Sequence, residues 1–140
     1  MKKFDAREEG AISHGGTFNN SPLTVVAGAT AMERILTEDA LKNLNALGDW
    51  MREEINKMFT SDESPFLMTG LGSINQFHCS HLIKPKSEFW IFFFFNLLER
   101  GFWITQRGLV SLSFAMTKED VQRFIVASIE ATQKVKATLK

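Results

Sequence analysis

The sequence predicts an α+β fold in which a small, mostly antiparallel sheet is covered by helices. Two stretches, residues 37–59 and 117–135, repeat apolar residues at spacings of three and four, which is typical of amphipathic helices. Short apolar runs punctuated by glycine lie between them, which is typical of strands. The predicted order is helix, helix, strand, strand, helix, strand, strand, helix, and 140 residues suffice to bury one core.

The first helix is expected from Pro22 to about Leu36. Ser21 is a candidate N-cap, and proline suits the first helical position because an N–H is not needed there. The helix is rich in small residues, including Gly28, which predicts close packing on another element.

The second helix is expected to be capped by Thr37 and to run to about Phe59. Acidic residues follow Thr37 directly, where they complement the helix dipole. Its apolar face is made of Leu41, Leu44, Leu47, Met51, Ile55 and Met58.

Two strands, residues 66–69 and 73–79, are then expected, joined through Gly70-Leu71-Gly72. A loop over residues 80–87 leads to a very apolar helix from Glu88 to Arg100 that stops at Gly101. Four successive phenylalanines, Phe92–Phe95, predict that this helix is buried on several sides. The apolar run is about half the ~20 residues needed to cross a bilayer, which favours a buried helix or an inter-subunit face.

The last part of the chain predicts two more strands, residues 102–105 and 109–113, around Gln106-Arg107-Gly108. Thr117 and Asp120 form a capping-box pattern before the final helix. One face of that helix is expected to carry Val121, Phe124, Ile125, Ser128, Ile129, Thr132 and Val135.

Composition excludes several kinds of protein. Basic and acidic residues both number 16, whereas a non-specific nucleic-acid binder carries a basic excess, so we expect no nucleic-acid partner. A single cysteine, Cys79, excludes an internal disulfide and fits a reducing, cytoplasmic location. The two N-terminal lysines are followed by no apolar stretch, so no secretory signal is expected. The apolar run over residues 89–98 is too short to predict a membrane span.

Two loops could bind anions. The Gly15-Gly16-Thr17 loop offers unobstructed N–H groups and a hydroxyl, which suit a phosphate, although such a loop is also an ordinary turn. Arg107 lies between two apolar runs and could form a bidentate pair with a carboxylate, or be a solvated turn residue. The spacing of His78, Cys79 and His81 matches no zinc framework, so no metal site is expected.

The stretches HGGTFNNSPLTVVAGATAMERILT, TGLGSINQFH and LLERGFWITQRGLVSLSFAMTKEDVQRFIVA resemble the C-terminal part of class III pyridoxal-phosphate enzymes. The closest branch is that of glutamate-1-semialdehyde aminomutases and β-amino-acid aminotransferases. The resemblance implies the C-terminal small domain of an aspartate-aminotransferase-like enzyme, with pyridoxal 5'-phosphate as cofactor, a small amino acid as substrate and a homodimer as the assembly.

The resemblance also implies roles for three residues. Thr17, with the neighbouring backbone at Gly16, would contact the cofactor phosphate held mainly by the other subunit. Arg107 would pair with the substrate carboxylate, which favours a transaminase over an aminomutase because aminomutases tend to lack an arginine in this turn. These roles come from the family pattern alone.

The family forms its Schiff base through a lysine upstream of the Gly15-Gly16-Thr17 loop, but only 16 residues precede Thr17 here. Lys2 and Lys3 lack the expected surroundings, so no catalytic residue is assigned and the chain alone is expected to be inactive. We expect residues 1–21 to be a loop segment from the large cofactor-binding domain, 22–36 a connecting helix and 37–140 the small domain. A non-catalytic interaction module derived from the same fold is the alternative.

Overall fold

The computed structural model describes residues 2–13, 15–18, 21–79 and 86–138. Its contacts divide the chain into two compact units, Met1–Ala40 and Leu41–Lys140. The first unit contains a short 3-10 helix, η1 (Lys2–Phe4), a loop and helix α1 (Pro22–Arg34). The predicted loop over residues 80–87 lies largely outside the described residues, which resume at residue 86.

Helix α1 begins at Pro22 as predicted and ends at Arg34, two residues before the expected end. Ser21 has the extended backbone of an N-cap, but its side chain makes no capping hydrogen bond. The predicted close packing of α1 is not found within the described chain, because none of its residues is buried and a Cβ at Gly28 would meet no atom within 4 Å. Small residues would allow another helix or strand to pack closely on α1, but the described chain provides none that does so.

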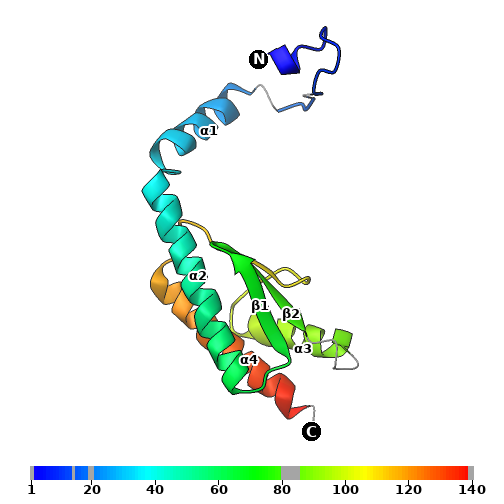
Figure 1. Ribbon diagram of the computed structural model, residues 1–140, viewed down its shortest axis with the longest axis vertical. Coiled ribbons are helices and arrows are strands. Elements are labelled where there is room, and N and C mark those ends of the chain that lie inside the picture. The colour runs from blue at the N-terminus through cyan, green and yellow to red at the C-terminus, as the bar shows by residue number, and fades with distance from the viewer. Residues whose placement is uncertain (1, 14, 19–20, 80–85, 139–140) are drawn as a thin grey trace. The chain divides into compact units, whose positions relative to one another are not determined.

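The other elements form an α+β fold, as predicted (Figure 1). In chain order they are α2 (Glu38–Ser61), β1 (Phe66–Leu71), β2 (Ile74–Cys79), α3 (Lys86–Glu99), β3 (Leu109–Ser111) and α4 (Lys118–Ala137). The strands form one antiparallel sheet in the order β1-β2-β3. Helix α2 begins as expected, with the Ala40 N–H donating to Thr37 Oγ1 at 3.2 Å.

The prediction of a strand over residues 102–105 is wrong, and the described sheet has three strands. Burial does alternate along this segment, since Ile104 is buried and Trp103 and Thr105 are exposed. Among the described backbone hydrogen bonds, however, this segment meets β3 only where the Thr105 N–H donates to the Leu109 carbonyl at 3.4 Å. A single hydrogen bond can close a turn, whereas a strand requires a series of backbone hydrogen bonds to its neighbouring strand.

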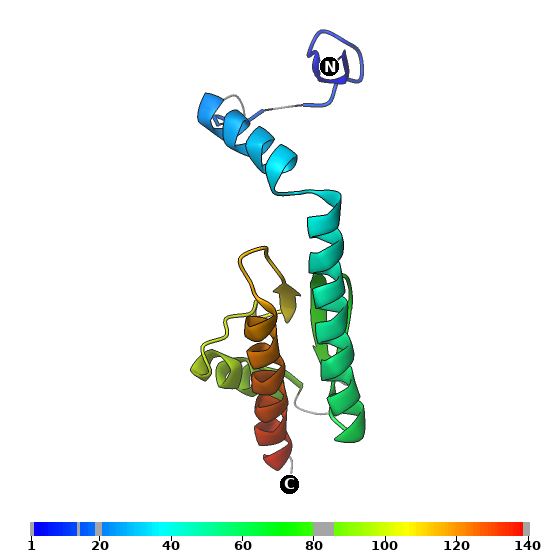
Figure 2. The same ribbon diagram turned by 90° about the vertical axis from the view of Figure 1, so that its left-hand side faces the viewer.

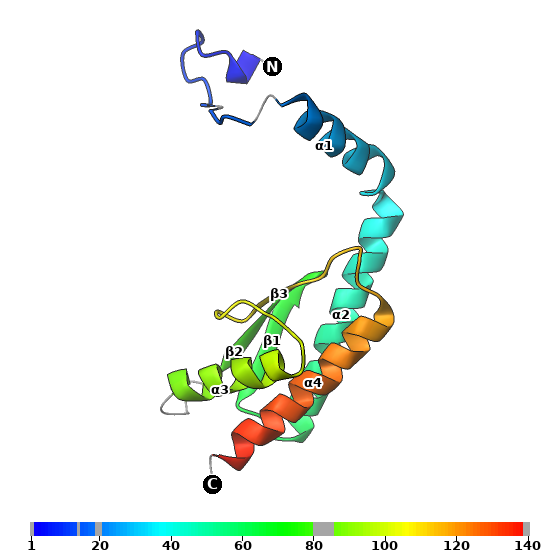
Figure 3. The same cartoon turned by 180° about the vertical axis from the view of Figure 1, so that it is seen from behind.

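The core lies between one face of the sheet and helices α2, α3 and α4 (Figures 1 and 3). Phe66 of β1 stacks on Phe93 of α3 with ring centroids 4.6 Å apart, and Phe77 of β2 meets the same ring edge-on at 5.2 Å. Phe124 of α4 approaches Phe77 at 6.1 Å. The other face of the sheet is uncovered within the described chain and exposes Leu67, Leu71 and Ile74.

Helix α3 ends as predicted, because Gly101 adopts a φ of +83° and closes a Schellman motif. The Gly101 N–H donates to the Leu98 carbonyl at 2.9 Å, and the Phe102 N–H donates to the Leu97 carbonyl at 3.0 Å. No helix in the described chain combines the length and apolar character needed to span a bilayer.

The prediction that α3 is buried on several sides is wrong for two of its four successive phenylalanines. Phe93 and Phe94 are buried, but Phe92 and Phe95 are 39% and 52% exposed. Four consecutive residues point all round a helix, whereas the sheet and α4 cover only one side of α3 in the described chain.

Helix α4, coloured orange to red in Figure 2, begins with the predicted capping box. The Asp120 N–H donates to Thr117 Oγ1 at 3.2 Å, and the Thr117 N–H donates to Asp120 Oδ2 at 2.9 Å. The Thr117 N–H bond and a second bond from the Thr117 hydroxyl to Asp120 Oδ2, at 2.7 Å, lower the pKa of the Asp120 carboxyl. The predicted apolar face is confirmed except that Ile129 is only half-buried, and the buried Ser128 and Thr132 hydroxyls each donate to a carbonyl four residues earlier.

The turn between β1 and β2 is docked on α2 by a backbone contact at Gly48. A Cβ on Gly48 would lie 2.2 Å from the Gly72 carbonyl oxygen and 2.8 Å from Ser73 Cα, so only glycine fits there. Asp49 Oδ1 accepts from the Gly72 N–H at 3.0 Å, and Asn45 Oδ1 accepts from the Ser73 N–H at 3.0 Å. Helix α2 therefore contacts the backbone of this turn through Gly48, Asp49 and Asn45.

Further along α2, Asn56 pairs with the outer edge of β1. Its Nδ2 donates to the Met68 carbonyl at 2.7 Å, and its Oδ1 accepts from the Met68 N–H at 2.9 Å. The side-chain amide thus replaces the neighbouring strand that an edge residue lacks.

We expect Gly48→Ala to lower the free energy of unfolding by roughly 1–3 kcal/mol, because the added methyl overlaps the hairpin backbone. Gly28→Ala is the matched control, since it adds the same methyl to a helix at a site with no neighbour within 4 Å. Urea unfolding followed by tryptophan fluorescence reports the second unit, which holds all three tryptophans, Trp50, Trp90 and Trp103. Equal urea midpoints for the two variants would contradict the assigned contact.

Asp49 predicts a specific loss of stability in acid. The Arg52 guanidinium donates to Asp49 Oδ1 at 2.6 Å and, with the Gly72 N–H, holds the pKa of this carboxyl below its usual 3.8. A lowered folded-state pKa stabilises the protein above pH 3.8, and that contribution disappears as the pH falls through the folded-state value. The stability difference between wild type and Asp49→Asn should therefore narrow below pH 3.8 in urea unfolding series. A constant difference down to pH 2 would show that the charge of Asp49 contributes nothing.

Candidate functional site

Arg107 lies in a tight turn between residues 105 and 109. The Gly108 N–H donates to the Thr105 carbonyl at 2.8 Å, and the Leu109 N–H donates to Thr105 Oγ1 at 2.9 Å. Gly108 has a φ of +87°, a conformation that side chains rarely adopt. The turn is therefore closed by hydrogen bonds between its own residues.

Two side chains from other elements hold this turn from outside. Trp90 of α3 donates its indole Nε1–H to the Gln106 carbonyl, and Gln76 of β2 donates its amide Nε2–H to the Arg107 carbonyl. The Phe77 N–H donates to the Gly108 carbonyl at 2.9 Å. Three consecutive carbonyls of the turn are thus bound by the folded domain.

The Arg107 side chain is exposed and has no ion pair with any residue in the described part of the chain. Its backbone is fixed while its guanidinium faces solvent. A planar guanidinium on a fixed backbone suits bidentate binding of a carboxylate.

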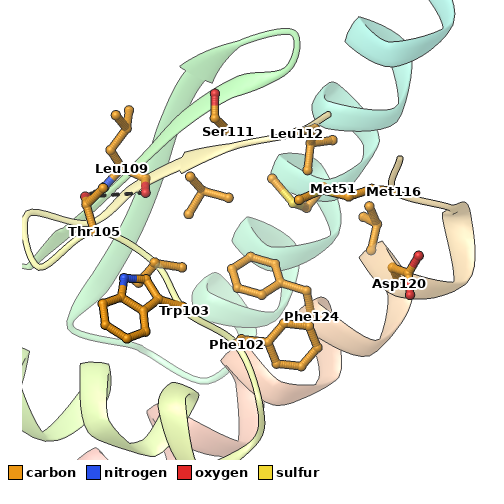
Figure 4. A pocket seen from close by; sticks show the side chains of 13 residues that line it. Met51, Phe102, Trp103, Thr105, Leu109, Ser111, Leu112, Met116, Asp120 and Phe124 are labelled. Carbon is orange, nitrogen blue, oxygen red and sulfur yellow. Dashed lines mark hydrogen bonds between the residues drawn. The ribbon is translucent and has the colours of Figure 1, made fainter. Parts of the chain in front are cut away.

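A mostly apolar cavity of about 320 Å³ opens at the edge of β3, beside the Arg107 turn (Figure 4). Met51, Val121 and Phe124 form part of its lining from the helices, and Thr105 and Leu109, the two ends of the turn, line it from the sheet side. Residues 102–105, which were expected to form a fourth strand, also line this cavity.

Gly16 and Thr17 lie in the first unit, in an exposed turn ahead of α1. The Ser21 N–H donates to the Phe18 carbonyl at 3.1 Å, which closes the chain toward the helix start. A Cβ at Gly15 would meet no atom within 4 Å, so the space around the loop is open. An exposed hydroxyl beside two glycines can accommodate a phosphate, as the sequence suggested.

His78 and Cys79 point to opposite faces of β2, as predicted, and His81 lies outside the described residues. His78 Nε2 lies 2.7 Å from Thr69 Oγ1 on the exposed face, and Cys79 is buried. Within the described ranges, no three His, Cys, Asp or Glu side chains lie together as a metal site would require.

Sequence reasoning missed the two residues that hold the Arg107 turn. Gln76 and Trp90 lie 31 and 16 residues from the carbonyls that they bind. Neither residue belongs to a recognisable motif, and only the strand register, which pairs Gln76 with Leu109, brings Gln76 to the turn.

Known proteins similar to this chain include aminotransferases and aminomutases. An uncharacterised aminotransferase of Schizosaccharomyces pombe is 36% identical over 137 residues, which cover 89% of this chain and 30% of that protein. The crystal structure of a β-phenylalanine aminotransferase from Variovorax paradoxus superimposes with a TM-score of 0.83 at 28% identity, covering 98% of this chain and 34% of that one. A glutamate-1-semialdehyde 2,1-aminomutase of Methanosarcina acetivorans is 25% identical, covering 86% of this chain and 31% of the enzyme. No family model matches.

The chain is therefore similar in sequence and fold to class III pyridoxal-phosphate-dependent aminotransferases over most of its own length, and its α+β fold is that expected of their C-terminal small domain. It spans about a third of the length of the relatives and structures that it matches.

Proposed function

We propose that this chain supplies the C-terminal small domain of a pyridoxal-phosphate-dependent aminotransferase that acts on amino acids. In this proposal residues 37–140 form the small domain, 22–36 the connecting helix and 1–21 a loop segment of the large domain. The observation that carries the proposal is the similarity in fold to a β-phenylalanine aminotransferase over nearly the entire chain. Amino-group transfer is the reaction of that class.

Arg107 is the residue that we assign to the substrate carboxylate. Its exposed guanidinium, its fixed turn and the absence of an ion pair within the described chain all support this role. A guanidinium pre-positioned in this way orients the amino acid, and orientation is a large part of what an enzyme contributes to a reaction between bound groups.

Gly16 and Thr17 are assigned to the phosphate of the cofactor, in a homodimer whose other subunit holds most of that cofactor. The exposed Thr17 hydroxyl supports the assignment, because a phosphate accepts hydrogen bonds from accessible donors. When bound, pyridoxal phosphate supplies the electron sink for amino transfer. The residues of this chain bind and orient groups around it.

A non-catalytic interaction module is the second candidate. It is supported by the exposed aromatic and aliphatic side chains on the outer side of α3, namely Ile91, Phe92 and Phe95. An apolar surface of this kind serves a partner protein as readily as a missing domain. The experiments below separate the two, because an interaction module has no need of Arg107 or Thr17.

The role of Arg107 can be tested in a chimera in which this chain replaces the matched segment of the Variovorax paradoxus enzyme. We expect Arg107→Met to lower kcat/KM for a β-amino acid by about 10–150-fold, the effect of losing hydrogen bonds from a charged group. Activity on an amine that lacks the carboxylate should not change.

Arg123→Met, which removes an exposed guanidinium of α4, is the matched control and should behave as the unsubstituted chimera. Arg107→Lys should fall between Arg107→Met and the unsubstituted chimera, because lysine keeps the charge without the bidentate geometry. An unchanged kcat/KM in Arg107→Met would refute the assignment of Arg107.

In the same chimera, Thr17→Ala should weaken cofactor binding about 10-fold or more through loss of a hydrogen bond to a charged phosphate. Absorbance titration of the cofactor-free protein measures this dissociation constant. Thr17→Ser should retain tight binding because it keeps the hydroxyl, and Thr30→Ala on α1 controls for a lost threonine methyl and hydroxyl elsewhere. If Thr17→Ala and Thr30→Ala bind the cofactor equally well, Thr17 does not contact the phosphate.

A further inference from the structure

We infer that Trp90 and Gln76 are positioning residues that fix the Arg107 turn in the geometry needed to bind a carboxylate. The inference rests on the proposed role of Arg107. It adds two residues to the site that touch neither substrate nor cofactor and act only through the turn backbone.

Trp90 connects the turn to the aromatic core. Its ring lies 5.5 Å from Phe93 and 6.2 Å from Phe66, which stack on each other at the centre of the core. Its Nε1–H donates to the Gln106 carbonyl. The carbonyl directly preceding Arg107 is therefore held by a ring whose own position is set by packing.

Gln76 connects the same turn to the sheet. Its Nε2 carries two hydrogens and donates both, one to the Phe77 carbonyl at 3.0 Å and one to the carbonyl of Arg107 itself. The first bond fixes the Gln76 amide relative to β2. The second bond holds the Arg107 carbonyl, and so the turn, at a fixed place relative to the same strand.

The two side chains meet at Gly108. A Cβ there would lie 2.7 Å from Trp90 Cη2 and 2.8 Å from Gln76 Nε2, closer than real Cβ atoms approach other heavy atoms. The absence of a side chain at Gly108 is thus what lets both side chains reach the turn.

Holding the carbonyls of residues 106 and 107 fixes the peptide planes on both sides of the Arg107 Cα, and so the direction of its Cα–Cβ bond. Bidentate pairing demands that direction because the guanidinium and carboxylate must be coplanar. A loose turn would have to be ordered on binding, at ~1–2 kcal/mol per residue, which corresponds to about a 5–30-fold weaker affinity.

The first test uses the 140-residue chain in solution. We expect ¹⁵N relaxation to give rigid backbone order parameters, about 0.85, for residues 106–108 in the unsubstituted chain and values below about 0.6 in Trp90→Phe and Gln76→Met. Trp50→Phe is the matched control, because Trp50 is also a half-buried helical indole packed against the core. Gln122→Met on the exposed side of α4 controls for the glutamine change.

The second test measures the consequence in the chimera. Trp90→Phe and Gln76→Met should each raise KM for the β-amino acid about 5–30-fold, with kcat and the KM for an amine without a carboxylate unchanged. In an Arg107→Met background the same substitutions should have no further effect on KM. A merely structural role would instead reduce activity on both substrates and in both backgrounds.

The outcomes separate this inference from the proposed function. If Arg107→Met raises KM but Trp90→Phe and Gln76→Met behave like their controls, the positioning role is wrong while the role of Arg107 stands. If Arg107→Met has no effect, the proposed function itself fails. Should Trp90→Phe prevent folding, Gln76→Met decides the question, and unchanged order parameters at residues 106–108 in that variant would overturn the inference.

Discussion

The second unit depends on one backbone-to-backbone contact, that of Gly48 in α2 with the turn at Gly72 and Ser73. Because no side chain separates the helix from the hairpin, Asp49 and Asn45 can accept hydrogen bonds directly from the N–H groups of the turn. The register of β1 with β2 is then fixed relative to α2, and every position along β2 follows from it. The proposed site is built on that strand.

Two separate sets of contacts position the Arg107 turn within the second unit. Through the sheet, β2 carries Gln76 to the carbonyl of Arg107. Through the aromatic core, Phe66 and Phe93 hold the indole of Trp90, which binds the preceding carbonyl. Packing alone would position the turn loosely, and hydrogen bonds alone would have no rigid support. Together, the packing and the hydrogen bonds restrict the backbone conformation of the turn while the Arg107 side chain stays exposed.

Local signals in the sequence predicted local structure well. The capping box at Thr117 and the glycine stop at Gly101 were confirmed, because each depends on residues within a few positions of one another. The expected strand over residues 102–105 was wrong because strand formation depends on a hydrogen-bonded partner strand, which a short apolar run cannot reveal. Gln76 and Trp90 were missed for the same reason, since their roles arise only when distant segments meet. Gly16, Thr17 and Arg107 came from family resemblance, and their roles remain proposals.

The central claim is that this domain presents Arg107 to the carboxylate of an amino acid. A crystal structure of the chimera with cofactor and a non-reactive β-amino-acid analogue tests it most directly. We predict two guanidinium nitrogens of Arg107 at about 2.7–2.9 Å from the two carboxylate oxygens, with the turn unchanged from the structure described above. A carboxylate bound by another cation, with Arg107 directed into solvent, would contradict the account.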